Sequence, residues 1–229
     1  MQRKTIIRRC SLFSQETEAD TLYFEDEARR SGYRLIAGID EAGRGPLAGP
    51  VVAAAVVLPA GLRIRHLTDS KQLTPLKREH LFEEIQKRAI CLAVGISESE
   101  VIDRINILEA TQRAMEKAVM DLNPMPDYLL IDAVGIRSPI PQLGIVKGDL
   151  RSHSISAASV IAKVTRDRIM DEYHETYPVY NFRRHKGYGT PEHLIKIRTF
   201  GPSPIHRKTF RGVREHCTGM KKDQDLDIL

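Results

Sequence analysis

The feature that most constrains the fold is the segment 34–58, in which two short apolar runs flank a pair of acids and a glycine-rich turn. Asp40 and Glu41 close the first run, and a Gly-Arg-Gly turn at 43–45 follows at once. Because both runs are typical of buried strands, the two carboxylates lie beside a core, where they are costly unless a cation meets them. Glycines also let the backbone approach a ligand closely. The segment therefore predicts a metal site beside a phosphate-binding turn.

Length and charge allow several kinds of globular protein. The chain has 229 residues, of which 41% are hydrophobic, so it can bury a core as one domain with a small appendage or as two small domains. Lysine and arginine number 35 against 30 for aspartate and glutamate, which gives a net charge of +5 and a pI of about 9.1. This basic excess permits nucleic-acid binding without demonstrating it, and it suits an ordinary basic enzyme equally well.

The cysteines and the apolar runs indicate where the protein works. The thiols of Cys10, Cys91 and Cys217 have no C-x-x-C spacing, which argues against a zinc knuckle or a disulfide framework and favours a reducing cytoplasm. The initial stretch MQRKTIIRRC is basic but lacks the apolar run of a signal peptide. The longest apolar run, near 51–58, is too short to span a bilayer. We therefore expect a cytoplasmic protein with no membrane segment.

Apolar periodicity and turn residues predict alternating strands and helices. Strands are expected at 34–41, 48–58, 90–96, 127–132 and 143–149, and helices at 15–31, 74–87, 107–122, 153–175 and 191–199. Thr74 and Pro75 are the expected cap and first residue of the second helix. Strands come first and mixed elements follow, which indicates a layered α/β domain with a C-terminal appendage from about Tyr177.

Four acids close or follow predicted strands. Asp40 and Glu41 end the first strand, Asp132 ends the strand at 127–132, and Asp149 precedes the long helix. Strand ends meet at one edge of an α/β sheet, although neighbours such as Asp40 and Glu41 share one site only where the strand twists or ends. Four carboxylates at close quarters need a divalent cation, and oxygen ligands favour Mg²⁺ or Mn²⁺ over zinc. Taken singly, each acid could instead be an ordinary turn or cap residue.

Seven motifs extend this pattern along the chain from about residue 20 to 212. They are IDEAGRGPLAGPVVAAAV at 39–56, DSKQL at 69–73, LLID at 129–132, KGD at 147–149, SAASVIAKVTRDR at 156–168, HKGYGT at 185–190 and IHRKTF at 205–210. In this order they resemble bacterial ribonuclease HII. The resemblance implies an α/β fold with a ribonuclease-H-like mixed five-stranded sheet flanked by helices and a small C-terminal helical part. The predicted order of elements is compatible with that fold without singling it out.

The resemblance implies an endonuclease that hydrolyses the RNA strand of RNA–DNA hybrids and cuts on the 5′ side of ribonucleotides embedded in duplex DNA. Two divalent ions, Mn²⁺ or Mg²⁺, would activate the attacking water and stabilise the leaving 3′ oxygen, leaving a 3′ hydroxyl and a 5′ phosphate. The matched catalytic and metal-binding residues are Asp40, Glu41, Asp132 and Asp149. The matched substrate-binding residues are Gly43, Arg44 and Gly45 at the 2′-hydroxyl and adjacent phosphate, Lys71 at the DNA backbone, and Tyr188 at the neighbouring sugar.

Some of these matches also have a physical reason or an alternative. A glycine turn lets the backbone reach a sugar whose 2′-hydroxyl separates RNA from DNA. Tyr188, in a glycine-rich loop, would otherwise be a surface aromatic without a role. The basic residues Lys163 and Arg166 and the clusters at 183–186 and 206–208 would either track phosphates or form solvated faces.

The chain departs from the family pattern after the third acid. It has Ala133 where the family usually has glycine, and we expect only a small effect on metal geometry. The segment 133–146 is less typical of the family than the other motifs. Among the histidines, His185 and His193 are expected to be loop structure rather than a metal pair.

The resemblance also suggests how the chain is divided and what it binds. The expected parts are a flexible basic N-terminus at 1–14, a ribonuclease-H-like catalytic domain at 15–176, a small helix and loop region packed on it at 177–218, and a charged tail at 219–229. The expected partner is nucleic acid, with no membrane, and the protein is expected to be a monomer. Residues 221–229 loosely resemble tails that dock on a DNA sliding clamp, with Gln224 as the anchor; the alternative is a disordered tail.

Three competing classes are weaker. Another ribonuclease-H-like enzyme, such as a transposase or junction nuclease, would use similar carboxylates without the turn at 43–45 or the HKGYGT motif at 185–190. A kinase or ATPase would need a G-K-[ST] sequence, which does not follow these glycines, and Pro46 and Pro50 obstruct a phosphate loop running into a helix. A non-catalytic hybrid-binding protein would not need four acids. The sequence therefore favours the nuclease.

Overall fold

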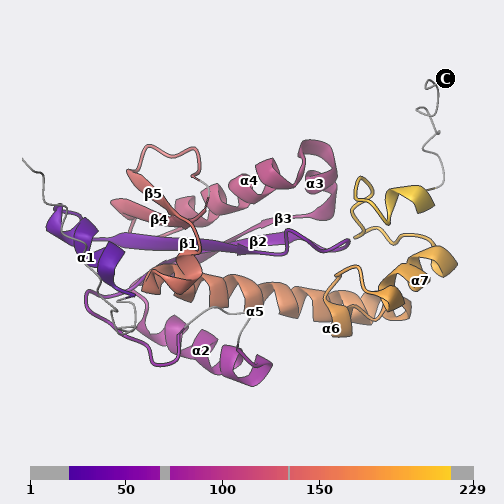
Figure 1. Ribbon diagram of the computed structural model, residues 1–229, viewed down its shortest axis with the longest axis horizontal. Helices are drawn as coiled ribbons and strands as arrows, with labels where there is room; N and C mark the ends of the chain where they lie inside the picture. Colours follow the sequence, from indigo (N-terminus) through magenta and orange to yellow (C-terminus); the bar gives the residue numbers. More distant parts are fainter. Residues whose placement is uncertain (1–20, 68–72, 134, 218–229) are drawn as a thin grey trace, which may run out of the picture.

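A mixed five-stranded sheet with helices on both faces organises the chain in the computed structural model, which describes residues 21–67, 73–133 and 135–217 (Figure 1). The strands are β1 (Ile36–Ala42), β2 (Val51–Val57), β3 (Cys91–Ser97), β4 (Tyr128–Asp132) and β5 (Gln142–Ile145). The helices are α1 (Tyr23–Arg30), α2 (Pro75–Arg88), α3 (Ser99–Ile105), α4 (Ile107–Met120), α5 (His153–Thr176), α6 (Phe182–His185) and α7 (Pro191–Phe200), with short 3-10 turns η1 (Gly148–Leu150), η2 (Pro178–Tyr180) and η3 (Arg214–His216).

The strand order is β3-β2-β1-β4-β5. β2 pairs antiparallel with both β1 and β3, whereas β4 runs parallel to both β1 and β5. The mixed five-stranded sheet expected from the resemblance is therefore confirmed.

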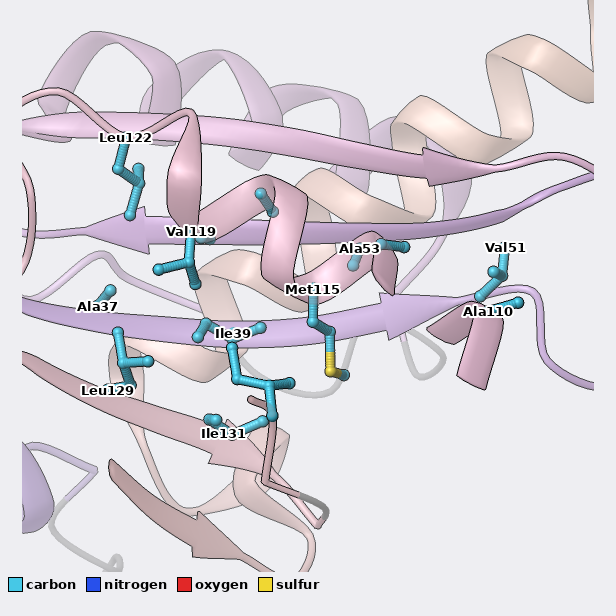
Figure 2. Close-up of a cluster of buried hydrophobic side chains, with 14 of the residues drawn as sticks. Ala37, Ile39, Val51, Ala53, Ala110, Met115, Val119, Leu122, Leu129 and Ile131 are labelled. Carbon is cyan, nitrogen blue, oxygen red and sulfur yellow. The ribbon is translucent and has the colours of Figure 1, made fainter. Parts of the chain in front are cut away.

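Helices cover the two faces of the sheet separately. α5 crosses one face over β1 and β2, with α2 packed against its outer side, and α4 lies on the opposite face over β2 and β3 (Figure 1). Because both faces are covered, every residue of β2 is buried and its sequence, VVAAAVV, shows no alternation. On the α4 face, Ile39, Met115, Leu129 and Ile131 belong to one buried cluster (Figure 2). Burial of each such side chain contributes about 1.5–3 kcal/mol.

A glycine in β1 sets the distance between that strand and α5. A Cβ added to Gly38 would lie 2.0 Å from the carbonyl carbon of Ser154, so only glycine lets the helix pass this close. The stretch SISAAS, which begins at Ser154, is buried and carries small side chains at most positions, so the helix stays close to the sheet. This close approach lets Ser159 of α5 reach Asp40 of β1.

Most expected elements are present, and the differences have local causes. Thr74 caps α2 through its hydroxyl, and a proline opens that helix as predicted. The prediction of a strand over 143–149 is wrong at its C-terminal end: β5 ends at Ile145, because Lys147 adopts a left-handed conformation (φ 56°) and turns the chain into η1. The short helices α3 and α6 are not among the expected elements.

The C-terminal elements pack against the end of α5 and the loop that follows β1. η2, α6 and α7 lie around the C-terminal end of α5 (Figure 1). Ala48, from the loop after β1, joins Met170, Tyr180, Phe182 and Ile205 in one buried cluster. The loop that carries the glycine-rich turn therefore packs against the C-terminal part of the chain.

Some expectations concern residues outside the described part of the chain. These are the N-terminal part at 1–14, the first residues of the helix expected at 15–31, which begins at Tyr23 in the structure, and the tail at 219–229. The boundaries of the four expected parts stay predictions. Within the described ranges, no helix combines the length and the apolarity needed to cross a membrane.

Candidate active site

The site lies where two parallel strands of the sheet separate. β1 and β4 pair as far as Ile39 and Ile131, after which β1 continues beside β2 and β4 beside β5. The chain then leaves these two strands toward opposite edges of the sheet, and α/β sheets bind ligands at such a point. Asp40, Glu41 and Asp132 follow the last β1–β4 pair directly. The topology thus brings three of the four predicted acids to one place.

Asp40 is the buried acid of this group, with only 4% of its surface exposed. Its Oδ1 accepts a hydrogen bond from the amide of Glu41 at 2.7 Å, and the hydroxyl of Ser159 also donates to the carboxylate. Burial raises the pKa of Asp40 well above its usual range, and the charges of Glu41 and Asp132 raise it further. An ionised Asp40 is therefore unfavourable until a cation offsets the three carboxylates.

Asp132 and Asp149 are connected by the turn after β5. The amide of Gly148 in η1 donates to Oδ1 of Asp132 at 2.7 Å, which orients that carboxylate. Asp149 is the next residue, is buried, and has its carbonyl bonded by the hydroxyl of Ser156 on α5 at 2.5 Å. Asp149 is therefore placed beside Asp132 by a 3-10 turn tied to α5, rather than by the strand end expected from the sequence.

The acids suit a hard divalent cation. Among the residues that the structure describes, no three acidic, histidine or cysteine side chains converge closely enough to form a ready-made metal cage. The electrostatic contact among Asp40, Glu41 and Asp132 is nevertheless repulsive and centred on a buried group, which is the condition that a divalent ion relieves. Carboxylate oxygens are ligands that Mg²⁺ and Mn²⁺ accept and that structural zinc sites seldom use alone.

A cavity of about 220 Å³ opens beside these acids. It is lined by Glu41, Ala42, Gly43, Arg44, Gly45, Ser159, Lys163, Arg166 and Tyr188. The turn at 43–45 and Tyr188, which are 145 or so positions apart in the chain, therefore face the same space, as the resemblance implies. The Tyr188 ring is 47% exposed, and a Cβ added to Gly45 would lie 3.7 Å from its Cε1 atom. The cavity thus has an acidic side, a glycine-turn side and an aromatic side.

Gly43 is required by its backbone and by its surroundings. Its φ is +99°, a left-handed value that glycine adopts without strain. A Cβ at this position would lie 2.0 Å from Nε of Arg166 and 2.8 Å from the carbonyl oxygen of Pro50. Arg44, by contrast, is exposed, and its Nη1 lies 3.4 Å from Oε1 of Glu41.

Two buried arginines hold the loop that contains this turn. Arg166 donates to the carbonyls of Ala48, Pro50 and Lys186 at 2.9–3.1 Å. Arg207 donates to four carbonyls of the segment 43–49. Burial lowers the pKa of Arg166 to about 10 and, together with the charge of Arg166, that of Arg207 to about 9, so both guanidinium groups remain charged near neutral pH.

The predictions for two basic clusters need correction. His206 and Arg207 are buried, so neither a phosphate-tracking role nor a solvated face is right for them; Lys208 alone of the cluster at 206–208 is exposed. Arg166 is buried too, and it lines the cavity next to Gly43. The cluster at 183–186 mixes both situations, since Arg184 is exposed while His185 is buried.

The remaining predicted residues are distributed as follows. Lys163 lines the cavity, where burial lowers its pKa, and its Nζ lies 2.6 Å from Oδ1 of Asp167. Lys71 lies outside the described residues. His185 and His193 stack with ring centroids 4.3 Å apart and bond to carbonyls, which agrees with a structural role. Ser159 is the site residue that the sequence analysis missed, because one serine among several in a helix carries no signal of its own.

Comparisons with known proteins point to one family. The family model described as ribonuclease HII matches residues 37–213. The ribonuclease HII of Geobacter sulfurreducens is 57% identical over 207 residues, covering 90% of this chain and 95% of that protein. That of Bacillus subtilis is 55% identical over 191 residues, covering 83% of this chain and 75% of the relative.

Solved structures show the same fold. The crystal structure of the ribonuclease H2 from Pyrococcus horikoshii OT3 matches with a TM-score of 0.67 and 29% identity, covering 79% of this chain and 95% of that one. The ribonuclease HII in a complex with PCNA from Archaeoglobus fulgidus matches with a TM-score of 0.66 and 26% identity, covering 77% and 95% of the two chains. The chain therefore belongs to the ribonuclease HII family and is a ribonuclease H, an endonuclease that acts on RNA–DNA hybrids.

Proposed function

We propose that this ribonuclease H also cuts on the 5′ side of single ribonucleotides embedded in duplex DNA, with Asp40, Glu41, Asp132 and Asp149 as its catalytic and metal-binding acids. The observation that carries the assignment is Asp40, a buried carboxyl repelled by Glu41 and Asp132 at the separation of β1 and β4. Such a group destabilises the metal-free protein and is kept where function needs it.

The residues around the acids prepare them for the reaction. A bound divalent ion supplies the Lewis-acid chemistry of phosphodiester hydrolysis, by lowering the pKa of water and stabilising the charge on the leaving oxygen. Ser159 and the amide of Glu41 hold the carboxylate of Asp40, and the amide of Gly148 holds one oxygen of Asp132. Asp132 would then offer its second oxygen as a ligand. Hydrolysis would leave a 3′ hydroxyl and a 5′ phosphate, with either Mn²⁺ or Mg²⁺ as the ion.

The cavity beside the acids is suited to a ribose. Its volume of about 220 Å³ and its polar glycine-turn side favour a sugar with an attached phosphate. We assign the backbone of Gly43, Arg44 and Gly45 to the 2′-hydroxyl and adjacent phosphate, since that hydroxyl separates RNA from DNA. Tyr188, which lines the same cavity next to Gly45, would pack against the neighbouring sugar. Lys71 would contact the DNA backbone, as the resemblance to the family implies.

A contact with a sliding clamp is a second, separate proposal. It is supported by the similar ribonuclease HII from Archaeoglobus fulgidus, which is in a complex with PCNA, and by the charged sequence of residues 221–229, which ends in Leu226, Ile228 and Leu229. Gln224 would be the anchor. Binding to the host clamp that persists after deletion of 221–229 would exclude this segment as the docking site.

Cleavage of labelled duplexes tests the main proposal. The substrates are a DNA duplex with one ribonucleotide, an RNA–DNA hybrid and an all-DNA duplex, each with Mg²⁺, Mn²⁺ or EDTA. We expect metal-dependent cutting on the 5′ side of the ribonucleotide and no cutting of DNA alone. Cutting of the hybrid but not of the duplex with one ribonucleotide would contradict the proposal that embedded ribonucleotides are substrates. Asp132→Asn should bind all three duplexes and cut none; wild-type rates in this variant would overturn the site assignment.

A further inference from the structure

Arg207 makes an unusual set of contacts for a buried arginine. Its Nε donates to the carbonyl of Gly49 at 3.0 Å, its Nη1 to those of Arg44 and Pro46 at 2.9 and 2.8 Å, and its Nη2 to that of Gly43 at 2.5 Å. The residue is 0% exposed. One guanidinium therefore gathers four carbonyls of a single loop around itself, which a planar group with five donors can do and an ammonium group cannot.

These contacts determine the direction of two amide groups in the turn. In a trans peptide the carbonyl and the following N–H point to opposite sides, and the one cis bond in the described residues lies elsewhere, at Asn123–Pro124. Since the carbonyls of Gly43 and Arg44 point at Arg207, the amides of Arg44 and Gly45 point away from it. The turn borders the cavity, whereas Arg207 does not, so that direction is the cavity side.

The other peptides of the loop do not offer a donor in the same way. The carbonyl of Pro46 also points at Arg207, but the amide that follows it, on Leu47, is already bonded to the carbonyl of Gly187 at 2.8 Å. The carbonyl of Gly49 is followed by a proline, which has no amide hydrogen. Arg207 therefore prepares two adjacent donors, and both belong to the Gly-Arg-Gly turn.

We propose that Arg207 is a positioning residue that presents the amide N–H groups of Arg44 and Gly45 to the 2′-hydroxyl and adjacent phosphate of the ribonucleotide. The inference rests on the proposed role of the turn and adds the residue that orients it from the other end of the chain. Preorganised donors of this kind act without rearrangement when the substrate binds. The guanidinium also places a fixed positive charge beneath the turn, which favours an anionic ligand.

Binding measurements on the full-length protein in EDTA, where no cleavage occurs, test the inference. The readout is the ratio of affinities for a duplex with one ribonucleotide and for the same all-DNA duplex. Arg207→Lys should lower that ratio about tenfold, the effect of losing one hydrogen bond of this kind, while the affinity for all-DNA changes little. Arg214→Lys, the same change at an exposed arginine, is the matched control and should keep the wild-type ratio. An equal loss on both duplexes, or an unchanged ratio, would overturn the inference.

Amide NMR on the wild-type protein keeps the test decisive if the variant does not fold. The amide signals of Arg44 and Gly45 should shift on addition of the ribonucleotide duplex and much less with all-DNA, whereas that of Leu47, which is already bonded, should not. Unmoved signals for Arg44 and Gly45 would overturn the inference. If the wild type shows no preference for the ribonucleotide duplex, the proposed role of the turn itself is wrong. If the preference is unchanged in Arg207→Lys, only the proposed role of Arg207 is wrong.

Discussion

The Nε2 atoms of His193 and His206 lie 2.9 Å apart in the buried C-terminal part, and this contact determines the tautomers of both rings. The amide of Ser203 donates to Nδ1 of His206 at 2.9 Å, so neutral His206 carries its proton on Nε2 and donates it to His193. His193 then carries its own proton on Nδ1 and donates to the carbonyl of Tyr188 at 2.9 Å. The series of hydrogen bonds from Ser203 through His206 and His193 to Tyr188 is intact only while both rings are neutral.

These hydrogen bonds through His206 and His193 predict a loss of stability at mildly acidic pH. Burial lowers the pKa of His193 to about 4 and that of His206 to about 3. An unfolded histidine titrates near 6.5, so the unfolded state binds more protons below that pH, and the free energy of unfolding falls as pH decreases. The expected loss between pH 7 and pH 5 is about 2 kcal/mol for each ring, measurable by urea unfolding at several pH values. In His206→Gln the slope should be shallower; a slope equal to the wild type would contradict the prediction.

Asp40→Asn should separate stability from activity. Because the pKa of Asp40 is raised, its favourable contribution exists at low pH and is lost as pH rises through the folded-state value, so the ionised group destabilises the metal-free protein at pH 8. We expect the variant to melt at a higher temperature than the wild type in EDTA, to gain little from Mg²⁺, and to cleave nothing. Asp121→Asn, at an exposed acid, is the control and should match the wild type. A lower melting temperature for Asp40→Asn in EDTA would show that the carboxyl is not under electrostatic strain.

Three of the four acids are predictable because their signal is local. Asp40, Glu41 and Asp132 stand at the ends of short apolar runs, and parallel strand ends meet at one edge of a sheet. The assignment of Asp149 to the site rests on the resemblance, since the backbone at Lys147 leaves the strand conformation before the acid is reached. A left-handed residue other than glycine has no clear signature in one sequence.

The residues that hold the site in place, Arg207 and Ser159, are not predictable in this way, because the groups that they contact belong to distant segments of the sequence. Three consecutive basic residues at 206–208 are typical of a charged surface, yet His206 and Arg207 are buried. The carbonyls that satisfy Arg207 belong to residues about 160 positions earlier in the chain. Ser159 becomes a site residue only because Gly38 allows α5 to approach β1 closely. Local patterns do not contain these contacts.

Gly43→Ala should be more damaging than the same change at a glycine of equal conformation. Gly32 has a φ of +100° with no atom within 4 Å of an added Cβ, whereas Gly43 has a φ of +99° and meets Arg166 and Pro50. Left-handed strain costs both variants about 1–2 kcal/mol, and overpacking adds about 1–3 kcal/mol at Gly43 alone. We expect cleavage to fall about hundredfold in Gly43→Ala through displacement of the turn and little in Gly32→Ala. Urea unfolding and cleavage rates of the pair check this, and equal behaviour would contradict it.

Tyr188→Ala should weaken the reaction without affecting the metal. The ring lines the cavity next to Gly45 of the turn, and contact of an aromatic ring with a nucleotide contributes about 1–3 kcal/mol, the range for stacking on a base. Cleavage of the single-ribonucleotide duplex should therefore fall between about tenfold and a hundredfold. The rise in melting temperature on adding Mg²⁺ should remain as in the wild type. Tyr188→Phe keeps the ring and should retain most activity; wild-type activity in Tyr188→Ala would reduce the residue to a structural role.

Ala133→Gly should stabilise the protein and leave it active. Ala133 follows Asp132 with a φ of +60°, a left-handed value that costs alanine about 1–2 kcal/mol and glycine almost nothing. Glycine's greater freedom in the unfolded chain offsets about 0.4–1 kcal/mol of this gain. The net effect should be a stabilisation of up to about 1.5 kcal/mol. The cleavage rate should be unchanged, because the hydrogen bond from Gly148 that orients Asp132 is untouched. Ala60→Gly, in an exposed turn without a positive φ, should instead destabilise. Destabilisation of both variants in urea would mean that the backbone at Ala133 is not strained.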